Sequence, residues 1–182
     1  MAAAAALLAL ATGTASARTI DTGQNPIDET FTFTDCGYDI SLHVMGTETW
    51  IDKLRGGDLE EFHYLTPWFT SVRGELTQSV TNLSTGKSFV TVVHTKSWDQ
   101  RLLSVEGDVQ TYRRAGTFHR TLYADGQREY VSVGKYTYDF EYDTLGTEDP
   151  TDDVDTFIDG SYRQVGNGRN DFCTDVIDYT TS

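Results

Sequence analysis

Two cysteines, Cys36 and Cys173, are the residues of this chain whose chemistry is most restricted by their number and spacing. A redox centre would need a CxxC spacing, and a metal site would need further ligands close by. Neither pattern surrounds them, so a reactive thiol and a disulfide remain. If the chain is exported to an oxidising compartment, the two cysteines pair most simply with each other. We therefore expect a disulfide that joins the start of the first strand, at Cys36, to the C-terminal end.

Four histidines offer metal ligands, and no two of them have the tight spacing of a metal motif: His43, His63, His94 and His119. A barrel could still bring histidines together from different strands. His94 shares a strand face with Val90 and Val92, which places it either in the lumen or against a packed outer face. We predict no metal site and no cofactor, and keep His94 as a candidate polar contact for a ligand.

The acidic segment 143–156 carries carboxylates at the short spacing that a hard cation such as Ca²⁺ requires. It lacks the central glycine and the closing glutamate of an EF-hand loop. We interpret the segment as a charged, solvated loop, and the sequence leaves calcium binding there open.

Aromatic side chains make up 12% of the chain, and four of them alternate along one predicted strand: Tyr136, Tyr138, Phe140 and Tyr142. They either form the packed core of a β-barrel or line an apolar pocket in which phenol hydroxyls orient a small ligand. For the second alternative, the candidate pocket residues are His94, Tyr64, Trp98, Tyr136 and Tyr138. The sequence contains no GxSxG, P-loop or HExxH motif, so we predict no catalytic residues.

The elements that must position these side chains are mostly β-strands. Alternation of apolar and polar residues predicts strands over 38–44, 47–51, 59–66, 68–80, 89–98, 102–106, 109–114, 117–123, 129–133, 135–142 and 157–162. Turn residues separate them at 55–58, 81–88, 106–108 and 124–127, and 165–170 is predicted to be a loop. Residues 171–179 predict a helix. The pattern favours an all-β fold, an antiparallel up-and-down β-barrel of about eight strands with one short C-terminal helix.

Length and charge restrict the classes of partner. A chain of 182 residues suits one domain. The formal net charge is −14, and the basic residues are scattered along the sequence. Nucleic acids and anionic membranes require a basic face, so we expect neither as a partner. No segment is apolar over the length that a stable membrane insertion needs.

The N-terminus has the pattern of a secretory signal peptide. An apolar run from Ala2 to Ala11 precedes Ala15-Ser16-Ala17, an A-x-A cleavage site. No Lys or Arg precedes Arg18, so the basic start of such a peptide is missing and an N-terminal truncation is left open. We expect a signal peptide over 1–17 that is cleaved near Ala17, a polar extended tail over 18–29, a single β-barrel domain over 30–182, and a secreted product.

Four stretches carry a resemblance to a known family: FTDCGYDISLHVMG, NLSTGKSF, YVSVGKYTYDF and NDFCTDV. In this order, with an Asp-Gly hairpin before the third, they resemble a family of secreted actinobacterial proteins of unknown function. The resemblance covers most of the mature chain and implies a lipocalin-like or allene-oxide-cyclase-like barrel. It implies no activity. The lipocalin Gly-x-Trp signature is not matched, because Gly46 and Trp50 are four positions apart.

Taken together, these patterns predict non-catalytic binding of a small apolar or amphipathic ligand in a β-barrel. Two alternatives stay open: a barrel enzyme of the cyclase or isomerase type, and an extracellular interaction module with a filled barrel. An enzyme would need a titratable pair inside the barrel, and an interaction module would show an apolar surface patch. The sequence leaves the oligomeric state open.

Overall fold

The computed structural model describes residues 18–54, 68–147, 152–166 and 171–181. Over these residues the chain forms eight strands and one helix. Their bounds are β1 Arg18–Asp35, β2 Tyr38–Leu54, β3 Phe69–Asn82, β4 Ser88–Glu106, β5 Val109–Ala124, β6 Gln127–Asp143, β7 Val154–Phe157, β8 Arg163–Gly166 and α1 Phe172–Thr180.

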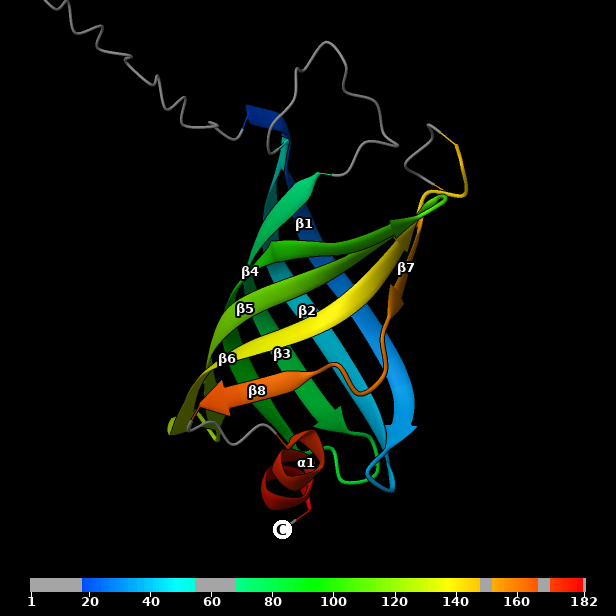
Figure 1. Cartoon of the computed structure of the whole chain (residues 1–182). Helices are drawn as coiled ribbons and strands as arrows, with labels where there is room; N and C mark the ends of the chain where they lie inside the picture. The colour runs from blue at the N-terminus through cyan, green and yellow to red at the C-terminus, as the bar shows by residue number, and fades with distance from the viewer. Residues whose placement is uncertain (1–17, 55–67, 148–151, 167–170, 182) are drawn as a thin grey trace, which may run out of the picture.

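The strands form one antiparallel, up-and-down sheet in the order β1-β2-β3-β4-β5-β6-β7. Strands β7 and β8 both pair with β6, β7 along its C-terminal end and β8 along its middle, at 134–137. The long strands cross obliquely and the sheet curls into a half-barrel, with α1 at one end (Figure 1). The predicted all-β, up-and-down architecture with one short C-terminal helix is confirmed.

Local signals explain where the strands turn. Asp125 and Gly126 have φ values of 50° and 75° and connect β5 to β6. Two consecutive left-handed residues match the twist of a hairpin, which is why Asp-Gly is favoured there. Between the turns, alternate residues point to opposite faces of the sheet. Ile40 and Val44 of β2 are buried on the concave face. Met45, the next residue after Val44, points to the convex face and is exposed.

The hydrophobic core lies at the end of the half-barrel that α1 covers. Its buried members come from four strands and the helix: Ile40, Val80, Phe89, Leu122 and Val176. Helix α1 presents Phe172, Val176 and Tyr179 to this core, the same three residues whose spacing predicts a shared face. The carboxylate of Asp171 caps the helix by accepting a hydrogen bond from the backbone N–H of Thr174 at 3.1 Å.

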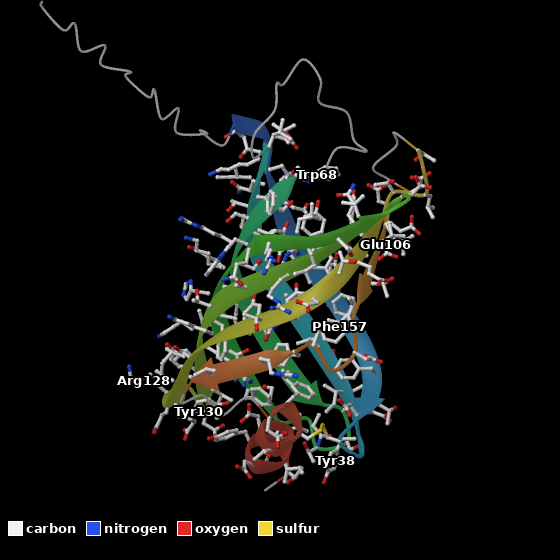
Figure 2. All side chains as sticks on the ribbon, in the orientation of Figure 1. Tyr38, Trp68, Glu106, Arg128, Tyr130 and Phe157 are labelled. Atoms are coloured by element: carbon white, nitrogen blue, oxygen red, sulfur yellow. A yellow bond between two sulfur atoms is a disulfide. The ribbon has the colours of Figure 1, made fainter. Side chains whose placement is uncertain are left out.

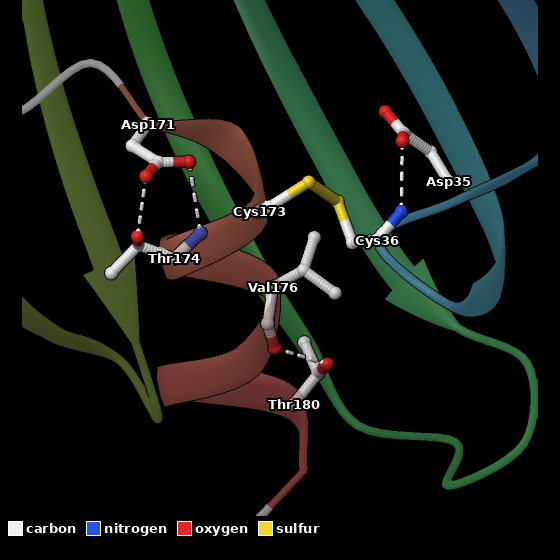
Figure 3. The surroundings of a disulfide bond; sticks show 7 residues. All are labelled: Asp35, Cys36, Asp171, Cys173, Thr174, Val176 and Thr180. Atoms are coloured by element: carbon white, nitrogen blue, oxygen red, sulfur yellow. Dashed lines mark hydrogen bonds between the residues drawn. A yellow bond between two sulfur atoms is a disulfide. The ribbon is translucent and has the colours of Figure 1, made fainter.

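The predicted disulfide is confirmed. Cys36 is bonded to Cys173, which lies in the first turn of α1, so the bond ties the helix to the β1–β2 hairpin (Figure 3). Cys36 does not start a strand, as the sequence suggested, but lies in the turn between β1 and β2 with a φ of 57°. The residues before Cys36 form strand β1, which pairs with the residues after Cys36 in strand β2.

Two other sequence predictions need correction. Residues 18–29 are not a polar tail but most of β1, and they pair with 44–54 of β2. Strand pairing uses backbone groups, so an edge strand needs few apolar side chains to form. Residues 157–162 do not form one strand, because β7 ends at Phe157 and β8 begins only at Arg163. The last two residues of β8, Val165 and Gly166, belong to the segment predicted to be a loop over 165–170.

The long strands continue through positions where breaks were predicted. Strand β5 passes through Gly116 and β6 through Gly134, while β4 accommodates irregular register near Asp99 and Leu102. The predicted turn 55–58 and strand 59–66 lie outside the described residues, as does the predicted signal peptide. Among the described residues, no helix has the length and apolar character needed to cross a membrane.

Candidate functional site

A cavity of about 510 Å³ opens on the concave face of the sheet, away from the core under α1. We call it the distal cavity. Trp68, one of its lining residues, lies at the end of the molecule opposite the helix, whereas Tyr38 and Tyr130 lie near the helix (Figure 2). Five aromatic side chains line the cavity: Trp50, Trp68, Tyr112, Phe140 and Tyr142. Its charged groups are Asp21, Asp52, Asp99, Asp155 and Arg114.

The register of the sheet explains why these residues meet. Residues directly opposite each other in neighbouring antiparallel strands project from the same face. Asp52 of β2 is opposite Thr70 of β3, and Asp99 of β4 is opposite Arg114 of β5. Thr70 is joined to Asp99 because its backbone N–H donates to Asp99 Oδ2 at 2.8 Å. The sheet thus carries one row of polar side chains across four strands.

Aromatic contacts form the walls beside this polar row. Tyr112 and Phe140 are cross-strand partners whose rings stack with centroids 5.6 Å apart. Trp68 meets the ring of Tyr142 edge-on at 5.3 Å. The Trp50 indole N–H donates to Asp21 Oδ2 at 3.4 Å, across the β1–β2 ladder. The walls are therefore held by ring packing and by at least one hydrogen bond to a carboxylate.

Arg114 is the one basic side chain among the described residues that line the cavity, and it already has partners inside the protein. Its Nε donates to Asp99 Oδ1 at 2.7 Å, and its guanidinium lies 4.5 Å from the centroid of the Phe140 ring. Asp99 is only 4% exposed and accepts hydrogen bonds from both Arg114 and Thr70. Burying this carboxylate would be costly without such partners, so the pair serves to hold the site together.

Among the described residues, no basic side chain forms an ion pair of this kind with Asp52 or Asp155. Partial burial raises the pKa of Asp52, and the neighbouring carboxylates of Asp21 and Asp99 raise it further, against the hydrogen bond that Thr70 Oγ1 donates at 2.7 Å. Asp155, an exposed residue of β7 that lines the cavity, has its pKa raised by desolvation, against the attraction of Arg114, and Asp99 and Asp153 raise it further. Both carboxyl groups therefore sit where negative charge is poorly compensated.

The two tyrosines of the cavity are hydrogen-bonding phenols rather than titrating groups. Burial raises the pKa of Tyr112, and the carboxylate of Asp99 adds to this. Burial and the hydrogen bond to Asp153 raise the pKa of Tyr142. The hydroxyl of Tyr112 donates to Gln110 Oε1 at 2.6 Å, and that of Tyr142 donates to Asp153. Neither hydroxyl is placed to act as a base near neutral pH.

The structure divides the predicted pocket residues between the two faces of the sheet. Tyr136 and Tyr138 are on the concave face, where Tyr136 lines a second cavity of about 450 Å³ and the two rings stack with centroids 6.1 Å apart. This second hollow, the helix-side cavity, also includes Phe172 of α1. Tyr138 contacts Phe140, so the two tyrosines lie between the helix-side and distal cavities.

His94 and Trp98 alternate with the inward residues of β4 and lie on the convex face. His94 is exposed and lies beside His119, its partner on β5, with ring centroids 6.1 Å apart. Trp98 lies within cation–π distance of Lys96, 5.8 Å from its ammonium nitrogen. The sheet therefore separates these two residues from Tyr136 and Tyr138. Tyr64 lies outside the described residues. Whether any of the five contacts a ligand stays a prediction.

Sequence reasoning missed the residues that form the distal cavity, above all Trp50, Asp52, Asp99 and Arg114. A local signal existed for some of them. Trp50 and Asp52 are two positions apart on one strand, as are Tyr112 and Arg114, so each pair was bound to share a face. A charged side chain that shares a strand face with a large aromatic is a recognisable exception to the usual division between apolar and polar faces.

The carboxylate of Asp35 lies close enough to the sulfurs of Cys36 and Cys173 for the three to share a metal ion. The two sulfurs are bonded to one another, so they offer no thiolate ligand. Comparison of the chain with family models, with curated proteins and with solved structures found no match to any of them.

Proposed function

We propose that this protein is exported and binds a small amphipathic molecule in the distal cavity without changing it. The observation that carries the proposal is the aromatic-walled cavity of about 510 Å³. Ligand sites are typically concave, about 300–1,000 Å³ in volume, and lined by apolar and aromatic side chains with a few polar groups. The disulfide suits an oxidising compartment, as the signal-peptide pattern at the N-terminus does.

The polar groups of the cavity suit orientation of a ligand. Asp99, Arg114 and Thr70 are joined by hydrogen bonds, so their positions are fixed before a ligand enters. The aromatic rings supply the apolar area whose burial favours binding, at about 25 cal/mol per Å². A ligand with one apolar body and one polar end would satisfy both parts of the cavity.

A barrel enzyme that works by general acid–base catalysis is the second candidate. The observation that favours it is the presence of two carboxyl groups, Asp52 and Asp155, whose pKa values are raised inside one cavity. Raised pKa values in a cleft are typical of catalytic acids and bases. Recovery of a bound molecule in altered form would favour this candidate over simple binding.

The chain offers a clean fluorescence test of binding. It contains three tryptophans, of which Trp50 and Trp68 line the distal cavity and Trp98 lies on the convex face. In a Trp98→Phe variant, the tryptophan signal arises from the cavity alone. We expect N-phenyl-1-naphthylamine, a neutral amphipathic dye, to change this signal saturably at micromolar concentration with one site per chain.

The matched control retains only the outer tryptophan. In a Trp50→Phe/Trp68→Phe variant, the emission of Trp98 should shift little when the dye is added. No saturable change in the Trp98→Phe variant would refute binding in the distal cavity, and native mass spectrometry of protein purified from its own host would show whether a ligand is retained.

A further inference from the structure

The charges of the distal cavity are strongly unbalanced. Among the described residues that line it, four carry a carboxyl group and one carries a guanidinium: Asp21, Asp52, Asp99, Asp155 and Arg114. Arg114 is hydrogen-bonded to Asp99 and stacked on Phe140, so it has little capacity left to bind an anionic ligand. The other three carboxyl groups, of Asp21, Asp52 and Asp155, form no salt bridge with any basic side chain that the structure describes.

The walls of the same cavity are of the kind that attracts a positive charge. Indole and phenol rings have electron-rich faces that attract ammonium groups, with tryptophan the strongest. Trp50 and Trp68 contribute two indoles, and the N–H of Trp50 donates to Asp21, which joins ring and carboxylate in one wall. Aromatic faces and uncompensated carboxylates thus line one volume.

We propose that the molecule bound in the distal cavity is an organic cation, an amine or quaternary ammonium group carried on an apolar body. This inference rests on the proposed function and names its ligand class. The apolar body would contact the stacked rings of Tyr112 and Phe140, and the cationic end would lie near Asp52.

The surroundings of Asp52 and Asp155 support this assignment. Asp52 faces Asp21 on β1, Thr70 on β3, Asp99 on β4 and Arg114 on β5. Its hydrogen bond from Thr70 does not offset partial burial and the two neighbouring carboxylates, so its pKa is raised. A bound cation would add to the attraction of Arg114, the one basic side chain of the described part of the chain that acts on Asp52.

Asp155 on β7 faces a similar set of groups: Arg114, Asp99 and Asp153, with Tyr142 hydrogen-bonded to Asp153 beside it. Desolvation and the two carboxylates outweigh the attraction of Arg114, which is shared with Asp99. Two carboxyl groups without an ion pair to a described basic side chain therefore line the cavity from β2 and β7, and each would attract a cation that enters it.

An inorganic cation fits the site less well. The carboxylate oxygens of the described residues that line the cavity do not form a group close enough together to share one metal ion. Calcium takes six to eight oxygen ligands at about 2.3–2.6 Å, and an aromatic wall supplies none. An ammonium group on an apolar body uses both the carboxylates and the rings.

Three probes of matched shape test the charge preference: 2-phenylethylamine, 2-phenylethanol and phenylacetate, each measured by isothermal titration calorimetry at neutral pH and low ionic strength. We expect the amine to bind about tenfold or more tightly than the alcohol, and the carboxylate to bind more weakly than either. Calcium chloride forms the fourth arm. Equal affinity for amine and alcohol, or tighter binding of Ca²⁺ than of the amine, would overturn the inference.

The Asp52→Asn variant tests the role of the carboxylate. Asparagine keeps an oxygen that can accept the hydrogen bond of Thr70, so the variant changes charge more than shape. We expect affinity for 2-phenylethylamine to fall about three- to tenfold and affinity for 2-phenylethanol to stay the same. The matched control is Asp28→Asn, which changes net charge equally but lies on the exposed surface, paired with His43 at 2.8 Å. An equal loss in both variants would show a general charge effect and refute the assignment.

Proton release provides an independent measurement. A cation that binds beside Asp52 and Asp155 lowers their raised pKa values, so amine binding at a pH where these carboxyl groups are partly protonated should release protons. Titrations in two buffers with different ionisation enthalpies would detect this, and the alcohol should release none. If neither the amine nor the alcohol binds, the proposed function itself fails. If the alcohol binds as tightly as the amine, the proposed function stands and only the cation preference is wrong.

Discussion

The indole of Trp50 lies over Gly23, its direct partner across the β1–β2 ladder. A Cβ atom on Gly23 would overlap ring atoms of Trp50, so the absence of a side chain on β1 makes room for a wall of the distal cavity. The same relationship recurs between Gly116 and Tyr136, again direct partners on the concave face. Glycine inside a strand often marks such a close approach.

Replacement of Gly23 by alanine should therefore disturb the cavity. The new Cβ would displace the Trp50 ring, and overpacking of this kind typically costs about 1–3 kcal/mol of stability. We expect a lower midpoint of urea unfolding together with a shift in tryptophan emission and weaker dye binding. Thr30→Ala, at an exposed position of the same strand, is the control and should change none of the three. Unchanged emission in Gly23→Ala would show that the ring does not rest on the glycine.

Loss of the disulfide should destabilise the helix end of the fold. Cys36 and Cys173 are 137 residues apart, and a bond that closes a long loop restricts the unfolded chain. We expect a Cys36→Ala/Cys173→Ala variant to lose about 2–5 kcal/mol of unfolding free energy, as measured by urea denaturation. Thiol titration of the unfolded, unreduced wild-type chain should find no free thiol, and two reactive thiols per chain would contradict the bond.

Two ion pairs that differ in burial should differ in their contribution to stability. Asp175 of α1 is fully buried and its Oδ2 lies 2.9 Å from a guanidinium nitrogen of Arg120. Asp175→Asn leaves that guanidinium buried without its counterion, a change that typically costs about 3–5 kcal/mol. Asp139→Asn breaks the more exposed pair with Arg113 and should cost much less, because solvent screens exposed ion pairs. Equal losses in urea unfolding would show that burial does not separate the two pairs.

The pH dependence of stability should reveal Asp52. Its pKa in the folded protein is raised above the ordinary value of 3.8, so between the two values the folded state binds more protons than the unfolded state. Stability then falls as the pH rises through that window. Asp52→Asn should remove this contribution, and the variant should be at least as stable as wild type at neutral pH even though it binds the amine more weakly.

Asp139 provides the contrast for that measurement. The hydrogen bond from Arg113 lowers its pKa, so its contribution to stability is present above the unfolded value of 3.8 and is lost as the pH falls through the folded value. Unfolding free energies measured across acidic pH should therefore change in opposite directions for Asp52→Asn and Asp139→Asn relative to wild type. A single direction for both would contradict the raised pKa of Asp52.

The strongest local signals in the sequence predicted structure correctly. The Asp125-Gly126 turn, the helix after Asp171 and the pairing of Cys36 with Cys173 all follow from one short segment or from a cysteine count of two. Strand ends were less reliable. The sequence predicts separate strands over 109–114 and 117–123, but β5 continues through Gly116, where the ring of Tyr136 lies against the glycine.

Residues 18–29 show a second limit. Their side chains are mostly polar, and nothing local indicates that their backbone pairs with β2. Strand pairing joins two different segments of the chain. Its hydrogen bonds are made by backbone N–H and C=O groups, which do not depend on the side chain. A sequence pattern based on side chains therefore cannot separate an edge strand from an extended tail.

By itself, the sequence determined that the chain is mainly antiparallel β, that its aromatics alternate along strands and that its two cysteines pair. Alternation shows which side chains share a face of one strand, and here it correctly grouped Tyr136 with Tyr138. Only the tertiary structure decided which face is concave, and it placed these tyrosines inside and His94 and Trp98 outside. The distal cavity depends in the same way on strand register. Asp52, Asp99 and Arg114 meet because backbone hydrogen bonds align three separate strands and because the sheet curls. No single segment of the sequence encodes the alignment or the curl.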